Sequence, residues 1–287
     1  MDIDEILIRP TSQELWNMST HPKTILVVGA TGSIGRLVVA EALRQRYQVR
    51  ALVRDLAKAR GLPEKAQSIV GDLTLPETLS DAVEGVSGIV FTHGADGSGK
   101  QGSERVDYGG VRNVIAALAG RQVRIALMTA IGVTNRDSAY NRSTLAHDWK
   151  RRAERLVRAS GMPYAIVRPG WFDYNRQDQH QLVALQGDTR HAGDPTDGVV
   201  ARNQIAQVLV SSLASASALG KTFELVAEHG PATTDFDALF KPLRADPPGS
   251  LDGAFETDDM PLDKEPADVR GDLRQYGAIA RGGQAGR

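Results

Sequence analysis

The chain of 287 residues contains no cysteine, which excludes disulfide bonds, thiolate catalysis and cysteine-ligated metal sites. It holds 34 lysine and arginine residues against 35 acidic ones, so the basic surplus that nucleic-acid binding requires is absent. No run of about 18 apolar residues occurs, so we expect no membrane span. The acidic start, residues 1–5, lacks the features of a secretory signal, and we expect a cytoplasmic location. The six histidines are scattered without metal-ligand spacing, so no metal site is expected.

What the sequence does contain is an alternation of short apolar runs and amphipathic stretches. Runs such as Thr24–Val28 are typical of strands buried on both faces of a parallel sheet. The pattern predicts an α/β fold with a doubly wound, mostly parallel sheet (a Rossmann fold) and a small C-terminal substrate lobe. The expected strands are residues 24–28, 48–53, 67–70, 88–92, 124–128, 164–168 and 222–226. The expected helices are residues 34–43, 79–83, 106–118, 147–159 and 204–213.

The two ends of the chain differ from this regular middle. We expect residues 1–22 to be a leader and residues 23–240 to form the Rossmann domain with its lobe. Beyond it, Pro242, Pro247 and Pro248 interrupt any periodic pattern, and the last residues are rich in glycine. This composition predicts that residues 241–287 are a loosely packed or disordered tail.

A glycine-rich turn at residues 29–35, Gly-Ala-Thr-Gly-Ser-Ile-Gly, joins the first strand to the first helix. Gly29 allows a tight turn, Gly32 lets a diphosphate approach the backbone, and Gly35 lets the helix pack close to the sheet. The diphosphate of a dinucleotide would bind at the helix N-terminus, on free N–H groups and the positive end of the dipole. The residues expected to bind cofactor here are Gly29, Thr31, Gly32, Ser33, Ile34 and Gly35.

The end of the second strand indicates which dinucleotide binds. Arg54 stands where an NAD site would carry an acidic residue for the ribose hydroxyl, and its guanidinium can pair with the 2′-phosphate of NADP(H). The neighbouring Asp55 could instead take the hydroxyl role, and Arg54 could be a solvated loop charge. The sequence favours NADP(H).

Several further segments resemble the atypical short-chain dehydrogenase/reductase superfamily, in its NmrA-like, NAD(P)-binding branch. The similarity extends over about residues 23–228 and leaves both ends unexplained. The matching segments are residues 27–35, 52–55, 70–73, 149–154, 160–164 and 166–170.

This resemblance implies roles for residues near the carboxyl ends of the strands. Asp72 and Leu73 would flank the adenine, and Lys150 would hydrogen-bond the nicotinamide ribose. Asp72 could equally be a turn or helix-capping residue, and Lys150 belongs to a basic run of the kind that usually lies on a solvated face. The remaining residues that the resemblance assigns to the cofactor are Thr92, His93, Gly94, Pro169, Gly170, Trp171 and Phe172.

The sequence departs from that superfamily at its catalytic pair, a tyrosine followed four residues later by lysine. Counting back from Lys150 gives Ala146, while Tyr140 is followed at that spacing by Thr144. Thr129 could be the usual hydroxyl residue, but it has no tyrosine to work with. Chemistry on alcohols and carbonyls is therefore in doubt, although cofactor binding is not. The remaining polar or aromatic candidates for catalysis or substrate contact are His93, His147, Trp171, Asp173 and Tyr174.

Two functions from different classes remain open. The first is an NADPH-dependent oxidoreductase whose hydride passes to a small, planar conjugated acceptor that needs no positioned acid. The second is a non-catalytic protein that senses NADP(H) or binds a partner. The sequence does not decide the oligomeric state. An epimerase or dehydratase acting on nucleotide sugars is disfavoured, because that chemistry needs the missing tyrosine.

Overall fold

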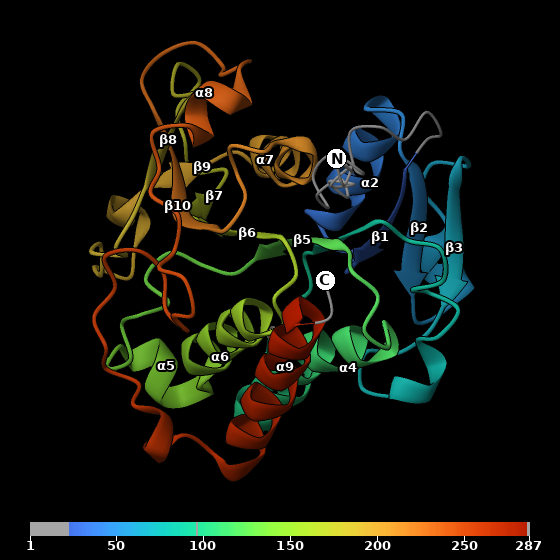
Figure 1. Cartoon of the computed structure of the whole chain (residues 1–287). Coiled ribbons are helices and arrows are strands. Elements are labelled where there is room, and N and C mark those ends of the chain that lie inside the picture. The colour runs from blue at the N-terminus through green and yellow to red at the C-terminus, as the bar shows by residue number, and fades with distance from the viewer. Residues whose placement is uncertain (1–22, 96, 286–287) are drawn as a thin grey trace, which may run out of the picture.

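A computed structural model describes residues 23–95 and 97–285 (Figure 1). Eight strands form one sheet in the order β3-β2-β1-β4-β5-β6-β10-β8, and all neighbours are parallel except β10 and β8. Residues 1–22, the expected leader, lie outside the described residues. The strands of this sheet are β1 (Thr24–Val28), β2 (Gln48–Val53), β3 (Ala66–Val70), β4 (Gly88–Phe91), β5 (Arg124–Met128), β6 (Tyr164–Pro169), β8 (Gln181–Leu185) and β10 (Lys221–Glu228).

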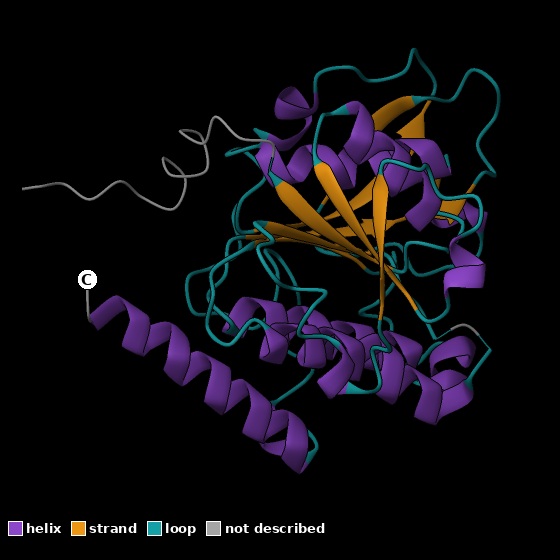
Figure 2. Cartoon of the chain, turned by 90° about the vertical axis from the view of Figure 1, so that its right-hand side faces the viewer, coloured by secondary structure: helices purple, strands orange, loops and turns teal. Residues whose placement is uncertain are grey.

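Helices cover both faces of the sheet, which lies between two helical layers in Figure 2. Successive residues of β1 point to opposite faces. Val27 packs in the core under α2 and α7, whereas Leu26 packs in the core under α4 and α6. The expected doubly wound α/β fold is confirmed. The helices are α2 (Gly35–Arg44), α3 (Gly99–Gly102), the π-helix η3 (Ser103–Tyr108), α4 (Gly109–Ala117), α5 (Ala139–Thr144), α6 (Ala146–Ala159), α7 (Arg202–Ala214), α8 (Phe236–Phe240) and α9 (Ala267–Ala285).

The connections place a crevice above the carboxyl ends of β1 and β4. From β1 the chain runs outward through β2 and β3, then returns to β4 on the other side of β1. A reversal of strand order of this kind is where open α/β sheets bind their ligands.

Several elements differ from the sequence prediction. Residues 79–83 form turns rather than a helix, and the helix expected at 106–118 begins as the π-helix η3. The sequence prediction also omitted β8, which runs antiparallel to β10 at the edge of the sheet. A second, two-stranded sheet joins β7 (Trp171–Phe172) to β9 (Val199–Val200) in the small lobe.

The expectation of a loosely packed tail from residue 241 is wrong for the part that the structure describes. The segment that follows α8 supplies carboxylates that pair with α6, and α9 then packs against α6 (Figure 1). Met260, Val269 and Leu273 are buried. The glycines and prolines of this segment shape its turns, while its buried apolar side chains and its carboxylates both attach it to the core.

The positive charges that meet this segment lie on α6, in a basic run that was expected on a solvated face. Arg151, Arg155 and Arg158 are instead buried. Arg155 Nη2 lies 2.7 Å from Asp252 Oδ2, and Arg158 Nε lies 3.0 Å from Asp246 Oδ2. The carboxylates that neutralise these guanidiniums come from the C-terminal segment, so burial of the helix and docking of that segment depend on each other.

Candidate functional site

The glycine-rich turn is closely packed against the sheet. Gly29 has φ +83°, and a Cβ atom there would lie 2.7 Å from the backbone nitrogen of His93. A Cβ on Gly35 would lie 2.0 Å from the carbonyl oxygen of Gly29. Both positions therefore require glycine, and the turn brings backbone close to the end of β4 in the way that a bound diphosphate needs.

A cavity of about 890 Å³ opens above this turn. It runs along the carboxyl ends of β1, β2, β4 and β5, as expected from the strand order. Gly35, Pro169, Gly170, Trp171 and Tyr174 do not line it, although the sequence predicted site roles for them. The predicted residues that do line it are Gly29, Thr31, Gly32, Ser33, Ile34, Arg54, Asp72, Leu73, Thr92, His93, Gly94, Thr129, Lys150 and Phe172.

The loop after β2 separates the two residues that competed for the ribose position. Arg54 is exposed and lines the cavity, and its guanidinium makes no hydrogen bond or ion pair with the described residues. Asp55 does not line the cavity, because its carboxylate accepts the backbone N–H of Ala57 at 2.8 Å and caps a short helix. Of these two residues, only Arg54 therefore lines the cavity.

A second arginine, which the sequence analysis missed, joins this loop to the glycine-rich turn. Arg36 donates from Nε to the carbonyl of Thr31 at 3.0 Å and from Nη2 to the carbonyl of Lys58 at 3.3 Å. The signal available in the sequence was its position directly after Gly35. Arg36 thus fixes the spacing between the turn and the loop that carries Arg54.

Asp72 is a turn residue, as one of the two sequence hypotheses expected, and it also lies in the cavity wall. Its Oδ1 accepts the backbone N–H and the hydroxyl of Thr74, each at 2.8 Å, and the residue also lines the cavity. Burial alone would raise the pKa of Asp72, but the hydrogen bonds from Thr74 and the charges of Arg54 and Arg105 lower it. Asp72 is therefore an ionised turn residue at the cavity wall.

Lys150 reaches the cavity and is paired with a buried carboxylate. Its Nζ lies 2.6 Å from Oδ1 of Asp107, an aspartate in η3 that the sequence analysis did not identify. The backbone N–H of Ala95 donates to the same oxygen at 3.2 Å, and Asp107 is 4% exposed. Asp107 thus holds the lysine ammonium in one place and neutralises it.

His93 lies beside this pair, with Nε2 3.0 Å from the carbonyl oxygen of Val106. Burial, together with the charge of Lys150, lowers the pKa of His93 to about 4 against the opposing effects of Asp107 and Val106. The imidazole is therefore neutral near pH 7 and cannot serve as a proton donor in the way an imidazolium would.

Two of the predicted catalytic residues are engaged elsewhere. The hydroxyl of Thr129 donates to Oε1 of Glu154 at 2.6 Å. Glu154 is fully buried beside Arg168, whose Nη2 lies 2.5 Å from its Oε2. Tyr174 is 63% exposed, and its ring meets the edge of Trp171 at 6.1 Å away from the cavity wall. Thr129 thus lines the cavity with its hydroxyl proton donated to Glu154, and Tyr174 lies outside the cavity lining.

Tyr140, by contrast, lines the cavity although the spacing rule gave it no lysine partner. It lies on α5 and is 52% exposed. Its ring packs against that of His147 at 5.2 Å between centroids. His147 is one helical turn before Lys150, so the fold brings Tyr140 and Lys150 to the same cavity from different helices.

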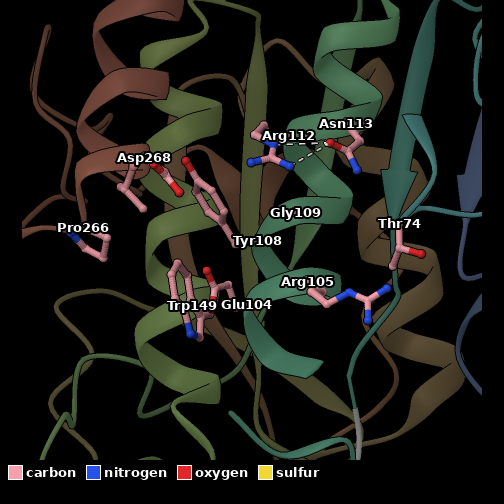
Figure 3. A pocket seen from close by; sticks show the side chains of 11 residues that line it. Thr74, Glu104, Arg105, Tyr108, Gly109, Arg112, Asn113, Trp149, Pro266 and Asp268 are labelled. Carbon is pink, nitrogen blue, oxygen red and sulfur yellow. Dashed lines mark hydrogen bonds between the residues drawn. The ribbon is translucent and has the colours of Figure 1, made fainter. Parts of the chain in front are cut away.

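A smaller hollow of about 220 Å³ lies beside the cavity, where η3, α4, α6 and α9 meet (Figure 3). Trp149 and Tyr108 are part of its lining, and Thr74 and Arg105 line both spaces. The hydroxyl of Tyr108 donates to Asp272 of α9 at 2.7 Å. Adjacent residues of the π-helix thus contact different helices. Asp107 pairs with Lys150 of α6, whereas Tyr108 bonds to Asp272 of α9.

Comparisons with known proteins agree with this geometry. Residues 29–216 match the model of a family described as NAD(P)H-binding. Sanguinarine reductase from Eschscholzia californica is 28% identical over 267 residues, covering 77% of this chain and 96% of that protein. A photosystem II assembly factor, Ycf39 from Cyanophora paradoxa, is 34% identical over 167 residues, covering 58% of this chain and 51% of that protein.

The fold is also shared with solved structures. An oxidoreductase from Lactococcus lactis superposes with a TM-score of 0.61 at 16% identity, covering 77% of this chain and 96% of that one. The expected resemblance to atypical short-chain dehydrogenases/reductases is confirmed. No helix in the described part of the chain is long and apolar enough to cross a membrane.

Proposed function

Because the chain belongs to the NAD(P)H-binding family, we propose that it is an NADPH-dependent oxidoreductase acting on small, planar conjugated acceptors. The supporting observation is that the glycine-rich turn, Arg54 and Lys150 all line one cavity. Its volume of about 890 Å³ lies at the upper end of the range of about 300–1,000 Å³ typical of small-molecule sites. A cofactor with an extended shape and an acceptor beside it both need such a space.

In this proposal, three parts of the chain each bind a different part of the cofactor. The glycine-rich turn receives the diphosphate at the N-terminus of α2, and the Arg54 guanidinium pairs with the 2′-phosphate. Lys150, fixed by Asp107, donates a hydrogen bond to the ribose next to the nicotinamide. The bound NADPH supplies the hydride, so the protein contributes orientation and exclusion of competing reactions.

The acceptor class follows from the walls of the cavity. Tyr140 and Phe172 give it aromatic surface, on which a flat ring system packs well. Residue 146 is a buried alanine, so no acid precedes Lys150 by one helical turn. A conjugated acceptor spreads the incoming electron pair over several atoms and depends less on an acid beside the reacting carbon.

A non-catalytic NADP(H) sensor is the second candidate, and one observation favours it. Asp107 already neutralises Lys150, and the pair is largely buried. A lysine held in this way can report the presence of the nicotinamide ribose without assisting chemistry. The similarity to an assembly factor is consistent with this alternative.

A steady-state assay of NADPH oxidation tests the proposal. We expect turnover with quinones or flavins and, because no acid precedes Lys150, rates at least about 10²-fold lower with simple ketones. Lys150→Ala should weaken NADPH binding and turnover together, whereas Lys241→Ala, an exposed lysine at the end of α8, should match the wild type. Tight NADPH binding without turnover of any acceptor would contradict the oxidoreductase and favour the sensor. Fast, stereospecific reduction of simple ketones would contradict the acceptor class.

A further inference from the structure

A further hollow, of about 540 Å³, lies at the end of the sheet opposite the cofactor cavity. It is formed where β1, β2 and β3 begin, whereas the cofactor cavity lies at the carboxyl ends of the strands. Its volume is within the range of about 300–1,000 Å³ that is typical of small-molecule sites. We call it the basic hollow, after the lining residues Arg46, Arg50 and Lys65.

The charged residues that line the basic hollow are all cations. In the described part of the chain, no aspartate or glutamate lines it, and none of the three cations makes an ion pair with a carboxylate. Arg50 donates instead to the carbonyl oxygens of Glu84 and Asp81, at 2.9 and 2.6 Å. The whole chain has a formal charge of -1, so the positive charge here is a local accumulation.

Two neighbouring groups show the same imbalance of charge. Glu41, the acidic residue of α2, has its carboxylate 2.7 Å from the guanidinium of Arg44 and is therefore already neutralised. Burial and the charge of Arg124 lower the pKa of Lys23, which directly precedes the lining residue Thr24, to about 8. An anion bound in the basic hollow would offset this excess of positive charge.

Arg46 is held in a backbone conformation that is unfavourable for arginine. Its φ is +65°, in the left-handed region that favours glycine. It comes directly after the C-cap of α2, where glycine is the commonest residue. An unusual backbone at a non-glycine residue is a reason to look for a function. The presence of arginine rather than glycine at this position is explained if the hollow uses its charge.

We propose that the basic hollow is a second ligand site, which binds the phosphate group of a small molecule. Guanidinium and ammonium groups are common phosphate ligands in proteins, and arginine can donate two hydrogen bonds to one phosphate. The side-chain amides of Gln48 and Gln67, which also line the hollow, add neutral donors. Because the hollow is separate from the cofactor cavity, it can bind its ligand while NADPH is bound. The inference does not depend on the proposed oxidoreductase reaction.

Calorimetric titration of pyrophosphate into the full chain, loaded with one equivalent of NADPH, tests this site. The bound NADPH keeps the probe away from the glycine-rich turn, and NADPH fluorescence reports whether the cofactor is displaced. We expect one pyrophosphate to bind per chain and to raise the melting temperature, because it binds the folded state. Its affinity should fall several-fold between about 0.02 and 0.2 M KCl, because salt screens exposed charges.

Arg46→Gly separates the loss of charge from a loss of folding, because glycine adopts a φ of +65° without strain. We expect its Kd for pyrophosphate to rise at least about ten-fold, the usual loss for one charge-assisted contact. Ala119→Gly is the matched control: Ala119 is also exposed with a positive φ, +50°, but it is uncharged and does not line the hollow. Lys65→Ala should weaken binding as Arg46→Gly does, and Lys241→Ala should match the wild type.

Wild-type affinity in both Arg46→Gly and Lys65→Ala would overturn the proposal, because the ion would then bind elsewhere. Release of NADPH by pyrophosphate, or no binding of pyrophosphate to the wild type, would overturn it as well. An equal affinity for sulfate would indicate an adventitious ion only and would also count against the site. None of these measurements uses an electron acceptor, so failure of this site is distinguishable from failure of the proposed function.

Discussion

Helix α6 has two faces that carry similar basic residues and use them in opposite ways. On one face Lys150 reaches the cavity and meets a single carboxylate, Asp107. On the other, Arg151, Arg155 and Arg158 are buried under carboxylates of the C-terminal segment. The first face serves a ligand, whereas the second joins two distant parts of the chain. A basic run on a helix is therefore solvated only where no later segment of the chain brings carboxylates that cover it.

If the two faces are independent, changes in the buried network should alter stability and leave cofactor selectivity alone. The largest effect is expected for Arg168→Met. Arg168 Nη2 lies 2.5 Å from Glu154 Oε2 and 2.7 Å from Glu256 Oε1, and the loss of Arg168 leaves buried carboxylates unpaired. Removing one partner of a buried pair costs about 3–5 kcal/mol.

Urea denaturation of the apoprotein measures this cost. Arg44→Met is the control, because Arg44 is largely exposed in its ion pair with Glu41 and should change stability by less than about 1 kcal/mol. Equal stabilities of the two variants would show that the network beneath α6 contributes little. The preference for NADPH over NADH should be the same in both.

The second prediction concerns pH. Burial raises the pKa of Glu224 to about 7, aided by Asp188 and opposed by Arg168. Because the folded-state pKa is above the ordinary value of 4.5, the native state keeps a proton that the unfolded chain has lost. The stability contributed by Glu224 is therefore complete below about pH 4.5 and is lost as the pH rises to about 7, an effect of roughly 3 kcal/mol.

Glu224→Gln removes this titration. Between pH 4.5 and 7 we expect the unfolding free energy of the variant to rise relative to the wild type by roughly 3 kcal/mol. His93 titrates in the opposite sense over part of this range, since its pKa is lowered on folding, but both proteins retain it and its contribution cancels. A constant difference between the two proteins across this range would refute the prediction.

The smallest effect is expected on the cavity face. Arg54→Ala should reduce the preference for NADPH over NADH by about ten- to a hundred-fold, the equivalent of about 1.5–3 kcal/mol for a charge-assisted contact. Unfolding in urea without cofactor should be unchanged, because the guanidinium makes no hydrogen bond or ion pair with described residues. Titration of both cofactors into wild type and variant measures the effect. An unchanged preference for NADPH over NADH in Arg54→Ala, or a less stable apoprotein, would contradict the division of roles between the two faces of α6.

The cavity face could be predicted because its signals are local. The turn from Gly29 to Gly35 and the cation at Arg54 lie within two adjacent strand–loop units, and hydrophobic patterning alone places these at one sheet edge. Asp107 was missed because it lies in the first turn of the helix expected at residues 106–118, where an aspartate is common and carries no special signal. Tyr140 was set aside on spacing, since the turn of chain that brings it to the cavity depends on Leu145 in a left-handed conformation.

The C-terminal segment could not be predicted for a different reason. Its carboxylates, such as Asp252 and Glu265, look like solvated charges until they are paired with arginines about 100 positions earlier. The composition of a segment indicates how much surface the segment can bury by itself. It does not show whether residues elsewhere in the chain will pair with its charges. The segment after residue 241 was therefore misjudged because the partners of its carboxylates and of its buried apolar side chains lie elsewhere in the chain.

The arginine face of α6, which the C-terminal segment covers, also limits the order in which the chain can fold. A ribosome delivers α6 well before Asp246, Asp252 and Glu265, so the emerging chain holds a helix whose arginines cannot yet be buried. Sequence separations of this length slow the search for native contacts. The arginine-bearing side of α6 therefore stays uncovered until nearly the whole chain has been synthesised. A release of the chain before residue 265 would leave that side exposed to chaperones and proteases.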